Sequence, residues 1–140
     1  MIDIENKVIN TIDEAFSDWD DLKVVSVLPR EDPQKNIVYV RMIDNSTYQE
    51  SLDQSLTEHH ARVSFRIECY SNLFNGAKEQ VKEMLQVVDW AMQGMKFTRT
   101  SYNFIPNYDP SYTRAYADYY AIVQQGKTEN GTTVHRMYRK

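Results

Sequence analysis

The nine residues from Arg62 to Tyr70 constrain the fold most, because apolar and polar side chains alternate along them. Four apolar side chains share one side of an extended chain: Val63, Phe65, Ile67 and Cys69. This period of two predicts a half-buried antiparallel strand. A register shift of one residue would bury two arginines and a glutamate, so the cost of desolvating charge fixes the register. We expect a central strand, with the following helix packed across the sheet.

Two segments have the apolar spacing of amphipathic helices. The first runs from about residue 5 to 17 with Asp3 as its N-cap, and Trp19 extends its apolar stripe. The second follows Asn75 as N-cap and ends near Gly94, where a left-handed residue commonly terminates a helix. Its Met-rich stripe is explained as core by helical spacing alone. Its polar side chains should mark the opposite face: Lys78, Glu79, Lys82, Glu83, Gln86 and Asp89.

Four further segments are rich in β-branched and aromatic residues and should be strands, namely 22–28, 37–43, 97–104 and 112–123. Residues 124–133 are typical of a mobile loop, and 134–140 of a short basic tail. The fold class that follows is α+β, an antiparallel or mixed sheet covered by two helices. We expect one domain over residues 1–125, followed by a flexible loop and tail over 126–140.

The segment 44–60 is long and polar and has no clear apolar period, although Leu52 and Leu56 have the spacing of a helical turn. A polar insertion of this length in a small domain is usually functional or disordered. We interpret it as a protruding arm or extended hairpin between two strands. Its low hydrophobicity prevents it from forming a core, so it should become ordered against a partner.

Charge and composition limit the function classes. The net charge of −4 argues against a dedicated nucleic-acid or anionic-membrane binder. The single cysteine excludes an internal disulfide, and we expect neither a signal peptide nor a membrane span. Acids gather early and bases late in the chain, which indicates either solvated faces or head-to-tail contact between subunits. These charges are Asp13, Glu14, Asp18, Asp20 and Asp21, against Arg136, Arg139 and Lys140.

Candidate chemistry is sparse, and we expect no catalytic residue, no cofactor and no metal site. Glu58, His59 and His60, with Glu68 and Cys69 further on, form the one metal-like cluster, but adjacent histidines on an extended chain point in opposite directions. A small metal-dependent enzyme using this cluster is the remaining enzymatic alternative. Cys69 falls on the apolar face and is expected to be a buried hydrophobe. The many tyrosines on polar strand positions favour an interaction protein.

Several segments together resemble the tail-terminator, or tail-completion, proteins of long-tailed, siphovirus-like bacteriophages of Firmicutes. Their order and spacing over residues 37–123 carry the resemblance: Val40–Asp44, Leu56–Arg62, Phe65–Asn72, Val87–Met92, Lys96–Arg99, Ile105–Asp109 and Tyr112–Tyr116. The resemblance implies a helix-covered sheet with an arm. It further implies a structural virion protein that forms a ring, typically a hexamer, at the head-proximal end of a tail. That ring stops tail-tube polymerisation and docks the neck of the filled head.

The partners implied are other copies of the chain, the tail-tube protein and the head-neck stopper protein, with no membrane. Genomic DNA would pass through the lumen without specific binding. The site would be the tail-neck junction of the virion, after assembly in the host cytoplasm. Another neck component, a stopper or adaptor, or a tail-tube subunit is the alternative. We expect the subunit or tail interface to include Asp44, Tyr48, Glu50, Leu52, Leu56, Glu58, His59, Tyr112, Arg114 and Tyr116.

Overall fold

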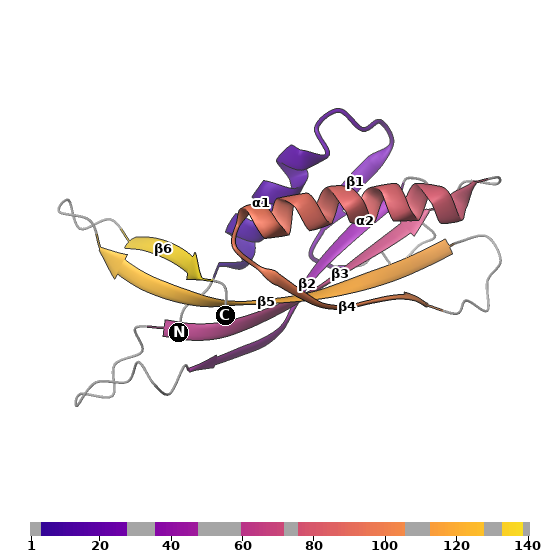
Figure 1. Ribbon diagram of the computed structural model, residues 1–140. Coiled ribbons are helices and arrows are strands. Elements are labelled where there is room, and N and C mark those ends of the chain that lie inside the picture. The colour runs from indigo at the N-terminus through magenta and orange to yellow at the C-terminus, as the bar shows by residue number, and fades with distance from the viewer. Residues whose placement is uncertain are drawn as a thin grey trace.

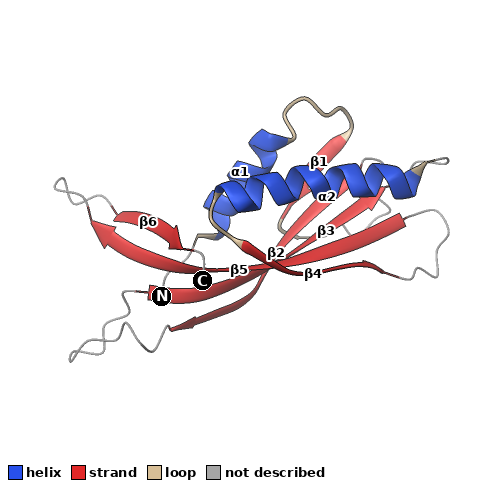
Figure 2. Cartoon of the chain, viewed as in Figure 1, coloured by secondary structure: helices blue, strands red, loops and turns tan. Residues whose placement is uncertain are grey.

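The computed structural model describes residues 4–27, 36–47, 60–71, 76–105, 113–127 and 133–138. The helices are α1 (Glu5–Ala15) and α2 (Ala77–Gly94). The strands are β1 (Leu22–Val25), β2 (Asn36–Thr47), β3 (His60–Ser71), β4 (Thr98–Ile105), β5 (Thr113–Lys127) and β6 (Thr133–Tyr138). Both described helices lie on the same side of the sheet (Figures 1 and 2). The α+β class predicted from the sequence is confirmed.

The six strands form one mixed sheet in the order β1-β2-β3-β5-β4, and β6 pairs with β5 beyond the end of β4. Only β1 and β2 run parallel, and the other pairs are antiparallel. The alternating strand that the sequence placed centrally is β3, with β2 on one side and β5 on the other. Its register opposes Arg66 to Asp118 of β5 and to Arg41 of β2.

The core lies between the helices and one face of the sheet. Val63, Phe65, Ile67 and Cys69 are fully buried, as the alternating pattern predicts. Helix α2 packs on β3 and β5 through its buried apolar stripe, which includes Met84 and Met92. The small residues of β5, such as Ala115 and Ala117, lie in the same core cluster.

The helix ends differ from the sequence predictions. The N-cap of α1 is Ile4 rather than Asp3, and that of α2 is Gly76, whose φ of 79° suits glycine, rather than Asn75. Gly94 is the last residue of α2, and the left-handed residue after it is Lys96. These helices are held mainly by tertiary burial rather than by side-chain caps, since neither N-cap donates or accepts a side-chain hydrogen bond.

The chain after residue 123 differs most from expectation. Strand β5 continues to Lys127, and residues 133–138 form β6 instead of a tail. Pairing of β6 with the second half of β5, from Ile122 to Lys127, supplies backbone hydrogen bonds that local propensity does not reveal. The boundary expected at residue 125 therefore falls inside a strand. The ends of β2, β3, β5 and β6 project past the helix layer (Figure 1).

The expected polar arm is partly a strand pair. Residues 44–47 continue β2 and pair with residues 61–64 of β3, after a bulge between Met42 and Asp44. The rest of the segment, residues 48–59, lies outside the described residues. The bulge leaves Ile43 43% exposed on the β2 edge, where an irregularity also discourages strand addition.

Candidate interaction surface

The sheet face turned away from the helices is lined by arginine and tyrosine. We call it the open sheet face. Its side chains alternate with those of the core face along the strands, and two of them, Ile37 and Ile122, are themselves buried. It also comprises Lys23 of β1, Tyr39, Arg41 and Asp44 of β2, Arg62, Ser64, Arg66, Glu68 and Tyr70 of β3, and Arg114, Tyr116, Asp118 and Tyr120 of β5.

The centre of the open sheet face is an ion pair between β3 and β5. The Arg66 Nε lies 2.9 Å from Asp118 Oδ1, and its Nη2 lies 3.0 Å from Oδ2. Ser101 Oγ of β4 donates a further hydrogen bond to Asp118 Oδ2 at 3.2 Å. The hydrogen bond to Asp118 raises the pKa of the Arg66 guanidinium above its ordinary value. This fork-to-fork geometry fixes both side chains.

Arginines of the face also lie over tyrosine rings. The Arg66 guanidinium carbon is 4.3 Å from the centroid of the Tyr116 ring, and that of Arg62 is 4.9 Å from the Tyr120 ring. Two weaker contacts, at 5.8 Å and 5.9 Å, join Arg114 to Tyr70 and Arg41 to Tyr39. Each such contact stabilises by about 0.5–1 kcal/mol at an exposed site. Together they preorder a surface of large, amphipathic side chains.

Tyr70 links the basic and acidic groups at one end of the face. Its hydroxyl donates to Glu68 Oε2 at 3.2 Å and accepts from Arg114 Nη1 at 3.4 Å. Burial raises the pKa of Tyr70, and the Arg114 hydrogen bond partly opposes that rise. Tyr70 therefore remains a neutral donor at physiological pH.

Three of the residues predicted for an interface lie on this face: Asp44, Arg114 and Tyr116. Arg114 and Tyr116 are close together on β5, whereas Asp44 lies near the far end of β2, beside Ser64. The others, Tyr48, Glu50, Leu52, Leu56, Glu58, His59 and Tyr112, lie outside the described residues. The prediction omitted Arg62, Arg66 and Tyr120, although their alternation with buried residues was visible in the sequence.

This arrangement is suited to macromolecular contact. Tyrosine and arginine are enriched at interfaces: tyrosine brings much rigid contact area, and arginine brings many hydrogen-bond donors. The network also holds the side chains in place before binding, which lowers the entropy cost of association.

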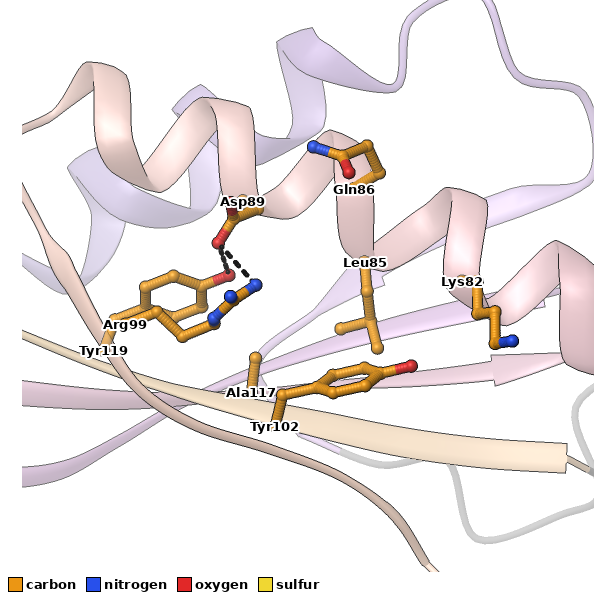
Figure 3. Close-up of a pocket in the computed structure, with 8 residues that line it drawn as sticks. All are labelled: Lys82, Leu85, Gln86, Asp89, Arg99, Tyr102, Ala117 and Tyr119. Carbon is orange, nitrogen blue, oxygen red and sulfur yellow. Dashed lines mark hydrogen bonds and ion pairs between the residues drawn. The ribbon is translucent and has the colours of Figure 1, made fainter.

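A second feature is a pocket of about 190 Å³ between α2 and strands β4 and β5 (Figure 3). Asp89 lies at one end and Lys82 at the other. Both come from α2, with Tyr102 below them. The sequence assigned Asp89 to the outer face of the helix, and that assignment is wrong, since Asp89 is 8% exposed.

Asp89 is buried because it accepts several hydrogen bonds. Tyr119 Oη donates to its Oδ1 at 2.9 Å, Gln93 Nε2 donates to Oδ2 at 2.6 Å, and Arg99 Nη1 lies 3.4 Å from Oδ1. Burial, then the hydrogen bond to Asp89, raises the pKa of Tyr119 well above its ordinary value. The cluster joins α2 to β4 and β5, and we assign it a structural role.

The metal-like cluster of the sequence is not assembled within the described residues. Glu58 and His59 lie outside them, while Glu68 and Cys69 are consecutive on β3 and point to opposite faces. Among the described side chains, no group of three or more His, Cys, Asp or Glu could hold a metal ion. Cys69 is fully buried, which confirms the expectation for it, and burial raises the pKa of its thiol.

Neither described helix is both long and apolar enough to cross a bilayer. Comparison of the chain with models of known protein families and with curated proteins gives no match.

Proposed function

We propose that this chain is a structural virion protein that forms a ring at the head-proximal end of a long phage tail. The ring stops polymerisation of the tail tube and provides the surface on which the head docks. The proposal rests on the order and spacing of the segments over residues 37–123, which resemble those of tail-terminator proteins. The proposed partners of the chain are the expected ones: further copies of the chain, the tail-tube protein and the stopper protein of the neck.

The observation that carries the proposal is the open sheet face. The described helices cover only one side of the sheet, and the other side presents an ordered set of arginines and tyrosines. Such a composition supports protein contact more than it supports catalysis. An assembly protein needs this kind of surface, because its function consists of its contacts.

The edges of the sheet support ring formation. Strand β1 covers β2 only from Asn36 to Tyr39, so the outer edge of β2 beyond Tyr39 has no strand partner among the described residues. Strand β4 forms the opposite edge beside the first half of β5. Two different edges make the subunit asymmetric, and asymmetric subunits associate head to tail, the arrangement from which closed rings are built.

The experiment is disruption of the gene in the phage genome that encodes the chain, followed by negative-stain microscopy of the lysate. Overlong tails or tubes, with full heads left unattached, are the expected result. A plasmid copy of the gene should restore tails of normal length, which excludes effects on neighbouring genes.

The other outcomes identify the alternatives. Tails of normal length that fail to join heads would assign the chain to a stopper or adaptor ring. Loss of all tail tubes would indicate a tail-tube subunit. Intact infectious particles would overturn the proposal.

A further inference from the structure

The end of α1 and the turn that leads into β1 form a strongly acidic surface. From residue 8 to 22 the chain has five acids and no lysine or arginine. All five side chains are exposed, and none forms an ion pair with another described residue. We call this surface the acidic end of α1, and it comprises Asp13, Glu14, Asp18, Asp20 and Asp21.

The open sheet face has the opposite charge. It carries five basic side chains against three acidic ones, although the whole chain is acidic. Two of its three acids are engaged within the face, Asp118 by Arg66 and Glu68 by the Tyr70 hydroxyl. Arg41 and Arg62 are exposed and lie over tyrosine rings, and their guanidinium groups form no hydrogen bond with another described residue.

The two surfaces cannot neutralise each other within one subunit. Helix α1 lies on the helix-covered side of the sheet, and the open sheet face is on the other side (Figure 1). Complementary surfaces on opposite sides of a subunit produce a heterologous contact, in which each copy binds the next. Opposite charge also accelerates encounter and fixes the register of such a contact.

We propose that the acidic end of α1 in one copy docks on the open sheet face of a second copy. Carboxylates of Asp18 and Asp20 accept hydrogen bonds from Arg41 and Arg62 of the neighbour, and its tyrosine rings supply apolar contact area. This inference rests on the proposed ring, and it specifies which surfaces join the subunits. The docking partner is another copy of the chain, because the same sequence carries both of the oppositely charged surfaces.

The test is a charge swap in full-length protein. Variant A carries Asp18→Lys and Asp20→Lys, and variant B carries Arg41→Glu and Arg62→Glu. Asp21 is retained because its φ is 54° and its carbonyl accepts a 2.8 Å hydrogen bond from the Asn36 amide. Arg66 and Arg114 are retained because they belong to the network of the face.

Each variant alone sets like charge against like charge at the substituted positions, where lysine would face arginine in A and aspartate would face glutamate in B. In an equal mixture, the lysines of A meet the glutamates of B, and Asp18 and Asp20 of B meet Arg41 and Arg62 of A. These pairs are then complementary at every junction of an alternating ring. Sedimentation velocity should show that the mixture associates at least about tenfold more tightly than A or B alone, and that added salt weakens this association.

The matched control carries Glu79→Lys and Glu83→Lys, two exposed positions on α2 outside both surfaces. Both of its docking surfaces are native, so on its own it should associate as tightly as the wild-type protein. Circular dichroism of each variant confirms that the fold is retained. A mixture of A and B that associates no better than A alone or B alone overturns the inference, and so does a control that associates as weakly as A or an absence of association in every sample.

This result is separable from the proposed function. Overlong tails after gene disruption, combined with a failed charge swap, would keep the tail role and reject this contact. A successful charge swap with intact phage particles would keep the contact and reject the tail role.

Discussion

Arg66 and Asp118 face each other across β3 and β5 and form a bidentate ion pair, although 52 residues separate them in the chain. Their side chains are 32% and 16% exposed, so water screens the pair only in part. Arg66 also lies over the Tyr116 ring. This pair therefore joins the central strand β3 to β5 at the centre of the open sheet face.

Replacement of Asp118 by alanine should destabilise the fold. The change removes both acceptors of Arg66 and leaves its guanidinium partly buried without a carboxylate. We expect the free energy of unfolding to fall by about 1–3 kcal/mol, the usual range for a lost charged hydrogen bond. Urea unfolding followed by circular dichroism measures the change.

Asp44→Ala is the control for this variant, because Asp44 is an exposed acid on the same face and should change the free energy by less than about 0.5 kcal/mol. Equal costs for the two variants would show that the ion pair contributes nothing beyond general surface charge.

Replacement of Tyr119 by phenylalanine should weaken the attachment of α2 to the sheet. The ring is retained, but the buried Asp89 carboxylate loses its donor at 2.9 Å. We expect a loss of about 1–3 kcal/mol in the free energy of unfolding at pH 7. Tyr102→Phe is the control, since its side chain is 38% exposed, and it should be nearly neutral. A neutral Tyr119→Phe variant would contradict the structural role assigned to Asp89.

The same variant should change the response to alkaline pH. Because the pKa of Tyr119 is raised in the folded chain, its contribution to stability is complete below the unfolded value near 10 and declines above it. The wild-type advantage over Tyr119→Phe should therefore shrink between pH 9.5 and 11, by up to about 1.4 kcal/mol per pH unit. A constant difference across that range would show that the folded chain does not favour neutral Tyr119.

Periodic segments of the sequence predicted most of the fold. Phe65 and Ile67 could only be buried together on one face of a strand, and α2 has apolar residues at helical spacing throughout. The cost of desolvating polar groups determines which face of such a segment is buried, whatever other elements it packs against.

Features that depend on partners far away in sequence were not predictable. The bond between Asp89 and Tyr119 requires the packing of α2 on β5, so Asp89 alone resembles any surface acid. Strand β6 is held by pairing with β5, and its Met137 is buried. The residues of β3 and β5 on the open sheet face were foreseeable from alternation, but the register that opposes Arg66 to Asp118 needed the pairing of β3 with β5.

Cys69 should be inert in the folded protein. It is fully buried on β3, and burial raises the pKa of its thiol, so thiolate is scarce. Modification by a thiol reagent at pH 8 should be at least about a thousandfold slower than in the urea-unfolded chain, because reaction requires opening. Since the chain has one cysteine, absorbance of the released reporter measures this site alone. Rapid modification of the folded protein would contradict the burial.

The last prediction contrasts two neighbours on α2. Met92 is fully buried in the core, whereas Trp90 is 67% exposed on the outer side of the same helix. Met92→Ala should lower the free energy of unfolding by about 2–5 kcal/mol, because it leaves a cavity that the core fills only in part. Trp90→Ala should change it by less than about 0.5 kcal/mol, although it removes the larger side chain. Urea unfolding of both variants provides the comparison. A greater loss from Trp90→Ala would mean that the outer side of α2 is packed in solution, and that the methionine stripe is not its main anchor to the sheet.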